Sequence, residues 1–99
     1  MTDEIELPPV LDLVAASGLL ENILERRGQN LLLNGAAVQR LGGQCLQVLL
    51  AARATWAADE QVLRLQNLSE DFIASLELMG LSPEDLMHHA EAKSEETKQ

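Results

Sequence analysis

Two adjacent glycines at the start of an expected helix are the first residues that could take part in chemistry. Gly42 and Gly43 follow the apolar segment Leu31–Leu33 and the turn pair Asn34-Gly35, and they lead into an amphipathic stretch. The first N–H groups of a helix have no partner inside it, so such a start can hold an anion or a phosphorylated side chain. No hydroxyl side chain stands at this start and no GxxxxGK pattern is present, so nucleotide hydrolysis is not supported.

Cys45, the single cysteine of the chain, lies near the same helix start. A helix N-terminus can lower the pKa of a thiol and make it nucleophilic. The same cysteine also opens an apolar stripe at helical spacing, where cysteine packs as a small hydrophobic residue, and this structural interpretation is favoured. The stripe contains Cys45, Val48, Leu49, Ala52 and Trp56.

The adjacent histidines His88 and His89 do not form a metal site. Neighbouring residues on a helix point about 100° apart, so the two rings cannot bind one ion together. Each could instead pair with a carboxylate one turn earlier, Glu84 or Asp85. We therefore expect surface histidines on a C-terminal helix.

The remaining charged pairs also have ordinary structural explanations. Asp59 and Glu60 fall between a helix and a strand and are expected to form a solvated turn. Arg26 and Arg27 fall at the end of a helix, where cations complement the helix dipole. With no nucleophile beside a base, no metal cluster and no converging carboxylates, we expect no enzyme, no metal and no cofactor.

Composition and charge favour a protein partner. The 99 residues are 46% apolar and 23% charged, which fits one globular domain. The net charge of −9 is concentrated at the ends: residues 1–6 hold three acids and no base, and residues 82–99 hold five acids and two lysines. Nucleic acids and anionic membranes need clustered Lys and Arg, which this chain does not have.

The chain shows no targeting or membrane signal. No basic region is followed by an apolar run at the N-terminus, and no apolar stretch approaches the roughly 18 residues that a membrane span needs. We expect a cytoplasmic protein with no direct membrane insertion.

Apolar spacing and capping residues predict the order strand, helix, strand, helix, strand, helix, helix. Pro8-Pro9 restricts the first apolar segment to an edge strand or a bend. The first half of the chain is predicted to form an edge segment over Met1–Glu6, a helix that ends at Gly28, and a strand over Gln29–Leu33 buried on both faces. The helix is predicted from the helical spacing of Leu13, Ala16, Leu20, Ile23 and Leu24. The second half is predicted to form a helix over Gly43–Ala57, a strand over Gln61–Gln66, a helix from Ser69 to Gly80, and a helix over 83–92.

This order predicts an α/β fold in which three to four helices pack on a small mixed β-sheet. The predicted single domain spans residues 1–92, with its core over 7–81 and a C-terminal helix over 83–92. Residues 93–99 are expected to form a disordered acidic tail.

From about Leu7 to Leu81 the chain resembles the STAS family, the domain of anti-sigma factor antagonists and sulfate transporter tails. In that family a buried strand ends in Asp, and after a loop a helix opens with an Asp-Ser-Ser/Thr-Gly-Leu pattern. The matching residues here are Leu31-Leu32-Leu33-Asn34, Val38, Leu41, Gly42-Gly43-Gln44-Cys45-Leu46, Val62–Gln66 and Leu76–Leu81. The resemblance implies the STAS fold.

One departure from the family pattern bears on regulation. Sigma-regulating members are phosphorylated on a serine at the start of this helix, and the phosphate breaks their complex with a partner. Gln44 occupies the phosphoacceptor-equivalent position here and cannot be phosphorylated. The resemblance therefore implies a permanently competent binding face.

A smaller subgroup is more similar still: small, single-domain STAS proteins encoded with bacterial chemotaxis genes. This resemblance implies a non-enzymatic module that binds the chemotaxis histidine kinase and modulates dephosphorylation of a response regulator. The phrases that carry it are Leu7–Leu13, Arg40–Leu50 and Thr55-Trp56.

The expected partner-binding residues are therefore Asn34, Arg40, Gly42, Gly43, Gln44 and Gln47. Two other STAS functions stay open: the cytoplasmic subunit of a phospholipid-retrieval ABC transporter, and an anti-sigma factor antagonist. The missing hydroxyl at Gln44 counts against both. A further alternative is weak binding of a nucleotide or other anion at the glycine-bearing loop.

Overall fold

The computed structural model describes residues 2–89, which form two small parallel sheets and three α-helices. The main sheet has the order β1-β3-β5, with β1 at Thr2–Glu6, β3 at Asn30–Asn34 and β5 at Leu63–Gln66. A second sheet pairs β2 (Val10–Leu11) with β4 (Arg40–Leu41). The α/β class and the edge position of the first strand are confirmed.

The prediction of a mixed sheet is wrong, because all of these strand pairs are parallel. Each paired strand is reached through a helical crossover, which returns the chain to the end of the sheet where the previous strand began. Among residues 2–89 the antiparallel pairing is limited to an isolated bridge between Leu63 and His88.

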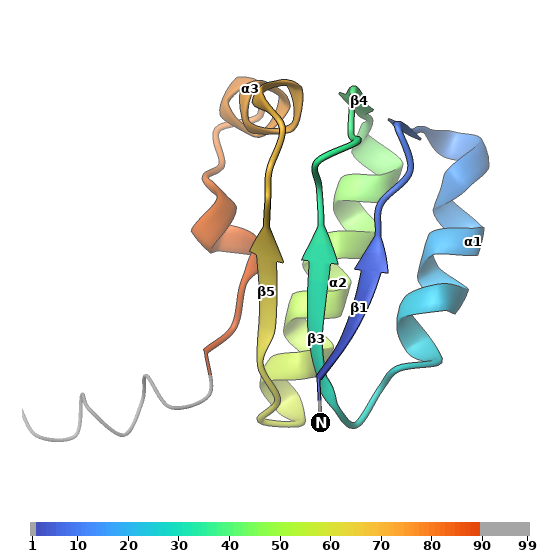
Figure 1. Cartoon of the computed structure of the whole chain (residues 1–99), viewed down its shortest axis with the longest axis vertical. Helices are drawn as coiled ribbons and strands as arrows, with labels where there is room; N and C mark the ends of the chain where they lie inside the picture. Colours follow the sequence, from blue (N-terminus) through green and yellow to red (C-terminus); the bar gives the residue numbers. More distant parts are fainter. Residues whose placement is uncertain (1, 90–99) are drawn as a thin grey trace, which may run out of the picture.

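The helices cover one side of the main sheet. They are α1 (Leu13–Leu24), α2 (Gly43–Ala58) and α3 (Glu70–Leu78). Figure 1 shows α2 behind the sheet, α1 beside the β1 edge and α3 across one end, with no helix in front of the strands. The expected helix over 43–57 is confirmed, and Ser69 caps α3 by accepting a hydrogen bond from Phe72 N at 3.0 Å.

Because one face of the sheet is open, residues along the strands alternate in burial. Leu31 and Leu33 are buried, whereas Leu32 between them is only half-buried. In β5, Leu63 and Leu65 are likewise buried and alternate with an exposed arginine. The prediction that the segment 29–33 is buried on both faces is therefore wrong.

Trp56 and Phe72, the two aromatic residues, lie at the centre of the core and are fully buried. Trp56 also donates its indole N–H to Gln29 O at 2.7 Å, which ties α2 to the chain that enters β3. Ile5 and Leu86 belong to the same core, so packing extends beyond the predicted limits of 7 and 81. Residues 90–92 of the predicted helix and the predicted tail, 93–99, lie outside the described residues.

Helix α1 buries a different face from the one that its apolar spacing suggested. Leu19 and Ile23 are its buried residues, while Leu13, Leu20 and Leu24 are exposed. Apolar side chains occur on both sides of this helix, so its periodicity could not identify the inner face. An exposed apolar stripe is left on α1.

The predicted helix over 83–92 is wrong in the part that the structure describes. Pro83–Leu86 form a short 3₁₀ turn, η1, after which Met87 is extended with φ −113° and ψ 157°. His88 then pairs with β5: its N–H donates to Leu63 O, and its carbonyl accepts from Leu63 N, both at 2.8 Å. Its ring Nδ1 lies 2.9 Å from Gln61 O, and within residues 2–89 no ion pair joins the ring to Glu84, the carboxylate with which it could have paired.

The charged pairs Arg26-Arg27 and Asp59-Glu60 connect separate elements. Arg26 Nε lies 3.1 Å from Asp3 Oδ2 on β1, and Arg27 donates Nε to Asp59 Oδ2 at 2.9 Å. The bond from Arg27 lowers the pKa of Asp59. Both arginines follow the end of α1 at Leu24, and the last turn of the helix holds no basic residue, so they join separate elements and do not have the predicted dipole role. Asp59 is likewise more than a solvated turn residue.

Gly35 joins the end of β3 to three other parts of the fold. Its N–H donates to Gln66 O at 3.0 Å, and its carbonyl accepts from Val38 N at 3.3 Å and from Ser69 N at 3.2 Å. A Cβ placed on Gly35 would lie 2.6 Å from the Phe72 ring. Only a residue without a side chain lets Phe72 pack this close.

We expect Gly35→Ala to destabilise the fold by about 1–3 kcal/mol, since the added methyl overpacks the core against Phe72. The matched control is Gly18→Ala, because no atom lies within 4 Å of a Cβ at this position in α1. There alanine should raise stability by about 0.5–1 kcal/mol through helix propensity. Urea unfolding followed by circular dichroism measures both changes, and a neutral Gly35→Ala would contradict the packing argument.

Candidate functional site

The two-stranded sheet places the starts of α1 and α2 at the same end of the molecule (Figure 1). Strand β2 leads directly into α1, and β4 leads directly into α2. Leu11 pairs with Leu41, and Leu11 O accepts a hydrogen bond from Gly42 N at 2.8 Å. The two helices therefore begin side by side.

Asp12 organises the start of α1. Its carboxylate accepts a hydrogen bond from Ala15 N at 3.1 Å and so caps the helix. Its backbone carbonyl accepts a hydrogen bond from the Cys45 thiol of α2 at 3.3 Å. One residue thus fixes the first turn of α1 and links it to α2.

The start of α2 has no side-chain cap. Gly42 is its N-cap residue, and the helical hydrogen bonds begin with Leu46 N donating to Gly42 O at 3.0 Å. The N–H groups of residues 43–45 precede this ladder. A Cβ on Gly42 would lie 3.4 Å from Leu11 O, so this position is closely packed against the end of β2.

Most of the predicted partner-binding residues occupy this one segment. Arg40, Gly43, Gln44 and Gln47 are exposed, and Gly42 is half-buried beneath them. The phosphoacceptor-equivalent residue, Gln44, is the second residue of α2. Because of this placement its side chain is open to a partner.

Asn34 is the predicted residue that does not join this segment. Its amide nitrogen donates to Glu4 Oε2 on β1 at 3.2 Å, and its amide oxygen accepts from Ala36 N at 2.9 Å. The side chain thus serves the turn after β3 and the contact with β1.

Two apolar residues that the sequence did not single out lie at this end of the fold. Leu13 is 69% exposed and Val14 is 86% exposed, although both are large and apolar. Exposed apolar side chains that cluster beside polar ones are typical of protein interaction sites. We name the helix-start surface by its exposed residues: Leu13, Val14, Arg40, Gly43, Gln44 and Gln47.

The sequence contained one signal for these two residues. Asp12 precedes them in a position suited to an N-cap, and the first turn of a capped helix lies at the end of an element, where side chains have few neighbours. Apolar spacing alone placed Leu13 among the regular helical positions, and only packing shows that it faces outward.

Cys45 is a core residue. It is fully buried, and burial raises the pKa of its thiol, with the negative charge of Asp12 acting in the same direction. The thiol therefore stays protonated at neutral pH despite its place in the first turn of α2. This environment supports the structural interpretation over the nucleophilic one.

We expect the Cys45 thiol to resist disulfide exchange with Ellman's reagent in the native protein at pH 7 and to react at the rate of a free thiol once urea unfolds the chain. The physical reason is its burial together with its raised pKa. Release of thionitrobenzoate from Ellman's reagent measures both rates. Rapid reaction without denaturant would show an accessible thiolate and contradict the assignment.

No metal centre or membrane span is found in the described part of the chain. Residues 2–89 contain no group of three His, Cys, Asp or Glu side chains that could hold a metal ion. None of the helices among these residues has the length and the hydropathy to cross a bilayer.

Comparisons with protein-family models, with curated proteins and with solved structures find no match to this chain. The fold and the helix-start surface therefore rest on the sequence and the geometry described above.

Proposed function

We propose that this chain is a non-enzymatic STAS-type interaction module that binds the histidine kinase of a bacterial chemotaxis phosphorelay and modulates dephosphorylation of the response regulator. The STAS and chemotaxis assignments come from the sequence resemblance over Leu7–Leu81. The structural observation that supports an interaction role is the pair of exposed apolar residues Leu13 and Val14 beside the open start of α2.

The composition of the helix-start surface suits recognition by a protein. Leu13 and Val14 provide apolar area that a partner can bury, and Arg40, Gln44 and Gln47 are exposed polar residues on β4 and α2 at the same end of the molecule. An apolar centre with a polar rim is the usual arrangement of protein interfaces. Apart from Arg40 the named residues are uncharged, and the nearby Asp12 carboxylate already accepts a hydrogen bond from Ala15 N.

Gln44 keeps the proposed interface in one chemical form, because glutamine cannot be phosphorylated. It occupies the position at which a serine would be phosphorylated in the resembled family, and its amide can donate and accept hydrogen bonds without carrying charge. Regulation of the complex would then come from phosphorylation of the partner and not of this chain.

A calorimetric titration against the full-length chemotaxis histidine kinase tests the proposal. We expect saturable binding and a changed rate of response-regulator dephosphorylation when the complex is present. No measurable binding at high micromolar concentration would overturn the proposal, and copurification with a transporter ATPase in place of the kinase would favour the transporter alternative.

We expect Val14→Ser to weaken binding to the kinase about fivefold or more, because an apolar contact at the centre of an interface is lost. Leu24→Ser is the matched control, since Leu24 is 46% exposed on the same helix but lies at its other end. Val14 is almost fully exposed in the free protein, so the unfolding curve of Val14→Ser should overlay that of the parent. Leu24 is about half covered, so Leu24→Ser is compared at a temperature at which its unfolding curve shows it fully folded. Equal losses of affinity at the two positions would contradict the placement of the interface.

We expect Gln44→Asp to separate folding from binding. A carboxylate in the first turn of α2 should stabilise the helix by about 0.3–1 kcal/mol through the dipole. The same charge, desolvated at the interface without a partner, should weaken kinase binding about tenfold or more. Urea unfolding and calorimetry measure the two effects, and unchanged affinity would mean that the partner docks elsewhere.

A further inference from the structure

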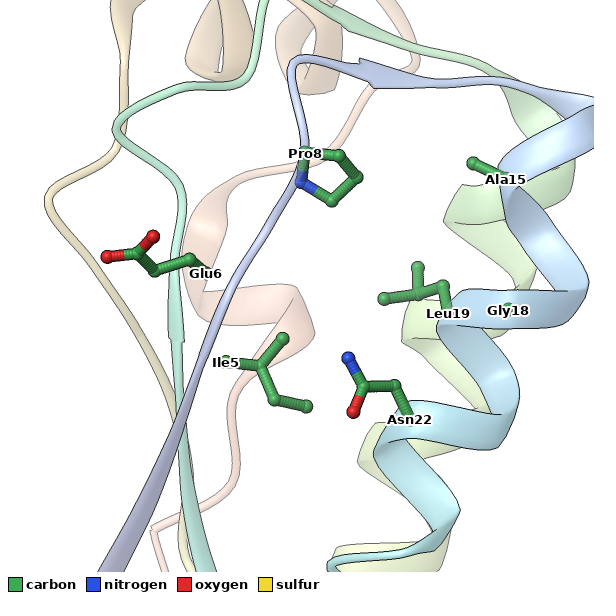
Figure 2. Close-up of a pocket in the computed structure, with 7 residues that line it drawn as sticks. All are labelled: Ile5, Glu6, Pro8, Ala15, Gly18, Leu19 and Asn22. Atoms are coloured by element: carbon green, nitrogen blue, oxygen red, sulfur yellow. The ribbon is translucent and has the colours of Figure 1, made fainter.

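A groove separates the outer edge of β1 from helix α1. Figure 2 shows Ile5, Leu19 and Asn22 projecting toward one another across it, with Pro8 at its upper end. The cavity has a volume of about 220 Å³. Its walls are mainly aliphatic, with the Asn22 amide as a polar group at the lower end.

The groove is open because α1 is held by other elements. Helix α1 makes its most extensive contacts with α2 and with β2. Gly18 faces the groove, and no atom lies within 4 Å of the place where its Cβ would be. A residue with a side chain at position 18 would narrow the groove, so glycine keeps the groove open.

The wall formed by β1 is an unpaired strand edge within residues 2–89, since β1 is the last strand of the sheet order. Leu7 N donates to Asn34 O at 2.9 Å, so residues 7, 5 and 3 direct their backbone groups to β3. Because the direction alternates along a parallel strand, Glu4 and Glu6 direct theirs outward. The Glu4 N–H is satisfied by Asp3 Oδ1 at 2.9 Å, which leaves the Glu4 carbonyl and both Glu6 groups at the edge.

We propose that this edge binds an extended segment of a partner protein as an additional strand, and that the segment alternates apolar and basic side chains. An added strand continues the pleat of the sheet, so its side chains alternate between the two faces. Those level with Ile5 enter the groove beside Leu19, where the walls are apolar. Those level with Glu4 and Glu6 lie on the open face of the sheet, beside two carboxylates.

Charge selects a basic segment for this site. The edge strand carries Glu4 and Glu6, which have no cationic partner within residues 2–89, besides Asp3, which is paired with Arg26. Glu21 is exposed on α1. Lysine or arginine side chains on an added strand would lie near these acids, and opposite charges on neighbouring strands stabilise pairing.

The same charges argue against the other occupants. A second copy paired through the same edge would bring Glu4 and Glu6 against the same two carboxylates, which is destabilising. Residues 90–99 of the chain have three glutamates against two lysines and no apolar residue larger than alanine. Neither provides the alternation of apolar and basic side chains that the edge requires.

The test uses the full chain and a fluorescein-labelled peptide of alternating lysine and valine. Fluorescence anisotropy should show saturable binding that weakens with added salt, because the basic side chains face carboxylates. Peptides of alternating lysine and glycine, or of glutamate and valine, should bind at least about tenfold more weakly, since each lacks one of the two required contacts. Absence of saturable binding by the lysine–valine peptide would overturn the proposal.

Two leucine variants on α1 locate the binding site. Gly18→Leu fills the groove and should weaken peptide binding about tenfold or more. Ser17→Leu introduces the same side chain one position away, outside the lining of the groove, and should change the peptide affinity less than about twofold. Amide shifts of Glu6 and of residues 15–22 on titration should agree. Binding that survives Gly18→Leu, or that both variants abolish, would contradict the site.

This inference does not depend on the proposed function. The peptide assay contains no kinase, and neither Gly18 nor Ser17 belongs to the helix-start surface. Loss of kinase binding would leave the groove result unchanged, and failure of peptide binding would leave the kinase titration unchanged.

Discussion

The close approach of Phe72 to Gly35 is the contact on which most of the fold depends. At this point the end of β3, the end of β5, the loop toward β4 and the start of α3 meet through hydrogen bonds to one glycine backbone. Ser69 strengthens the junction, because its hydroxyl donates to Val38 O at 2.6 Å while also capping α3. If the ring of Phe72 were forced outward, α3 would lose its anchor and the loop that leads to β4 would lose its support.

That junction also explains why the helix-start surface has a defined shape. The loop held by Gly35 and Ser69 delivers the chain to β4, where Gln39 N and Arg40 N both donate to Pro9 O, at 2.7 and 3.1 Å. Strand β4 then sets the position of Gly42 and the direction of α2. The exposed residues of the surface are thus carried on a backbone that the buried core positions.

The distribution of apolar residues on α1 links the two surfaces that we propose. Leu19 and Ile23 are the residues of α1 that are buried in the core, so the exposed Leu13 and Val14 at the start of the helix remain available for contact with a partner. Gly18 leaves space along the flank that faces β1. A helix needed only for stability would show one apolar stripe and a polar remainder, whereas α1 has apolar residues beyond those that its own core uses.

The sequence by itself determined the local elements and their caps. The glycine start and the stripe of α2, the helix that begins after Ser69 and the strand within Gln61–Gln66 each follow from spacing and residue type within a few positions, and the structure confirms them. Five of the six predicted partner-binding residues lie together for the same reason, since one short segment, Arg40–Gln47, carries them. The structure separates Asn34 from them because its amide finds partners on β1 and in its own turn.

Only the tertiary structure decided which side of α1 is buried, because apolar residues on both of its sides made the periodicity ambiguous. It also decided that the chain at Met87 and His88 is extended and not helical, since the backbone of His88 pairs with Leu63, a partner far away in the sequence. The open groove beside β1 has the same origin. A strand edge or a cavity is defined by which elements fail to meet, and local sequence patterns do not contain that information.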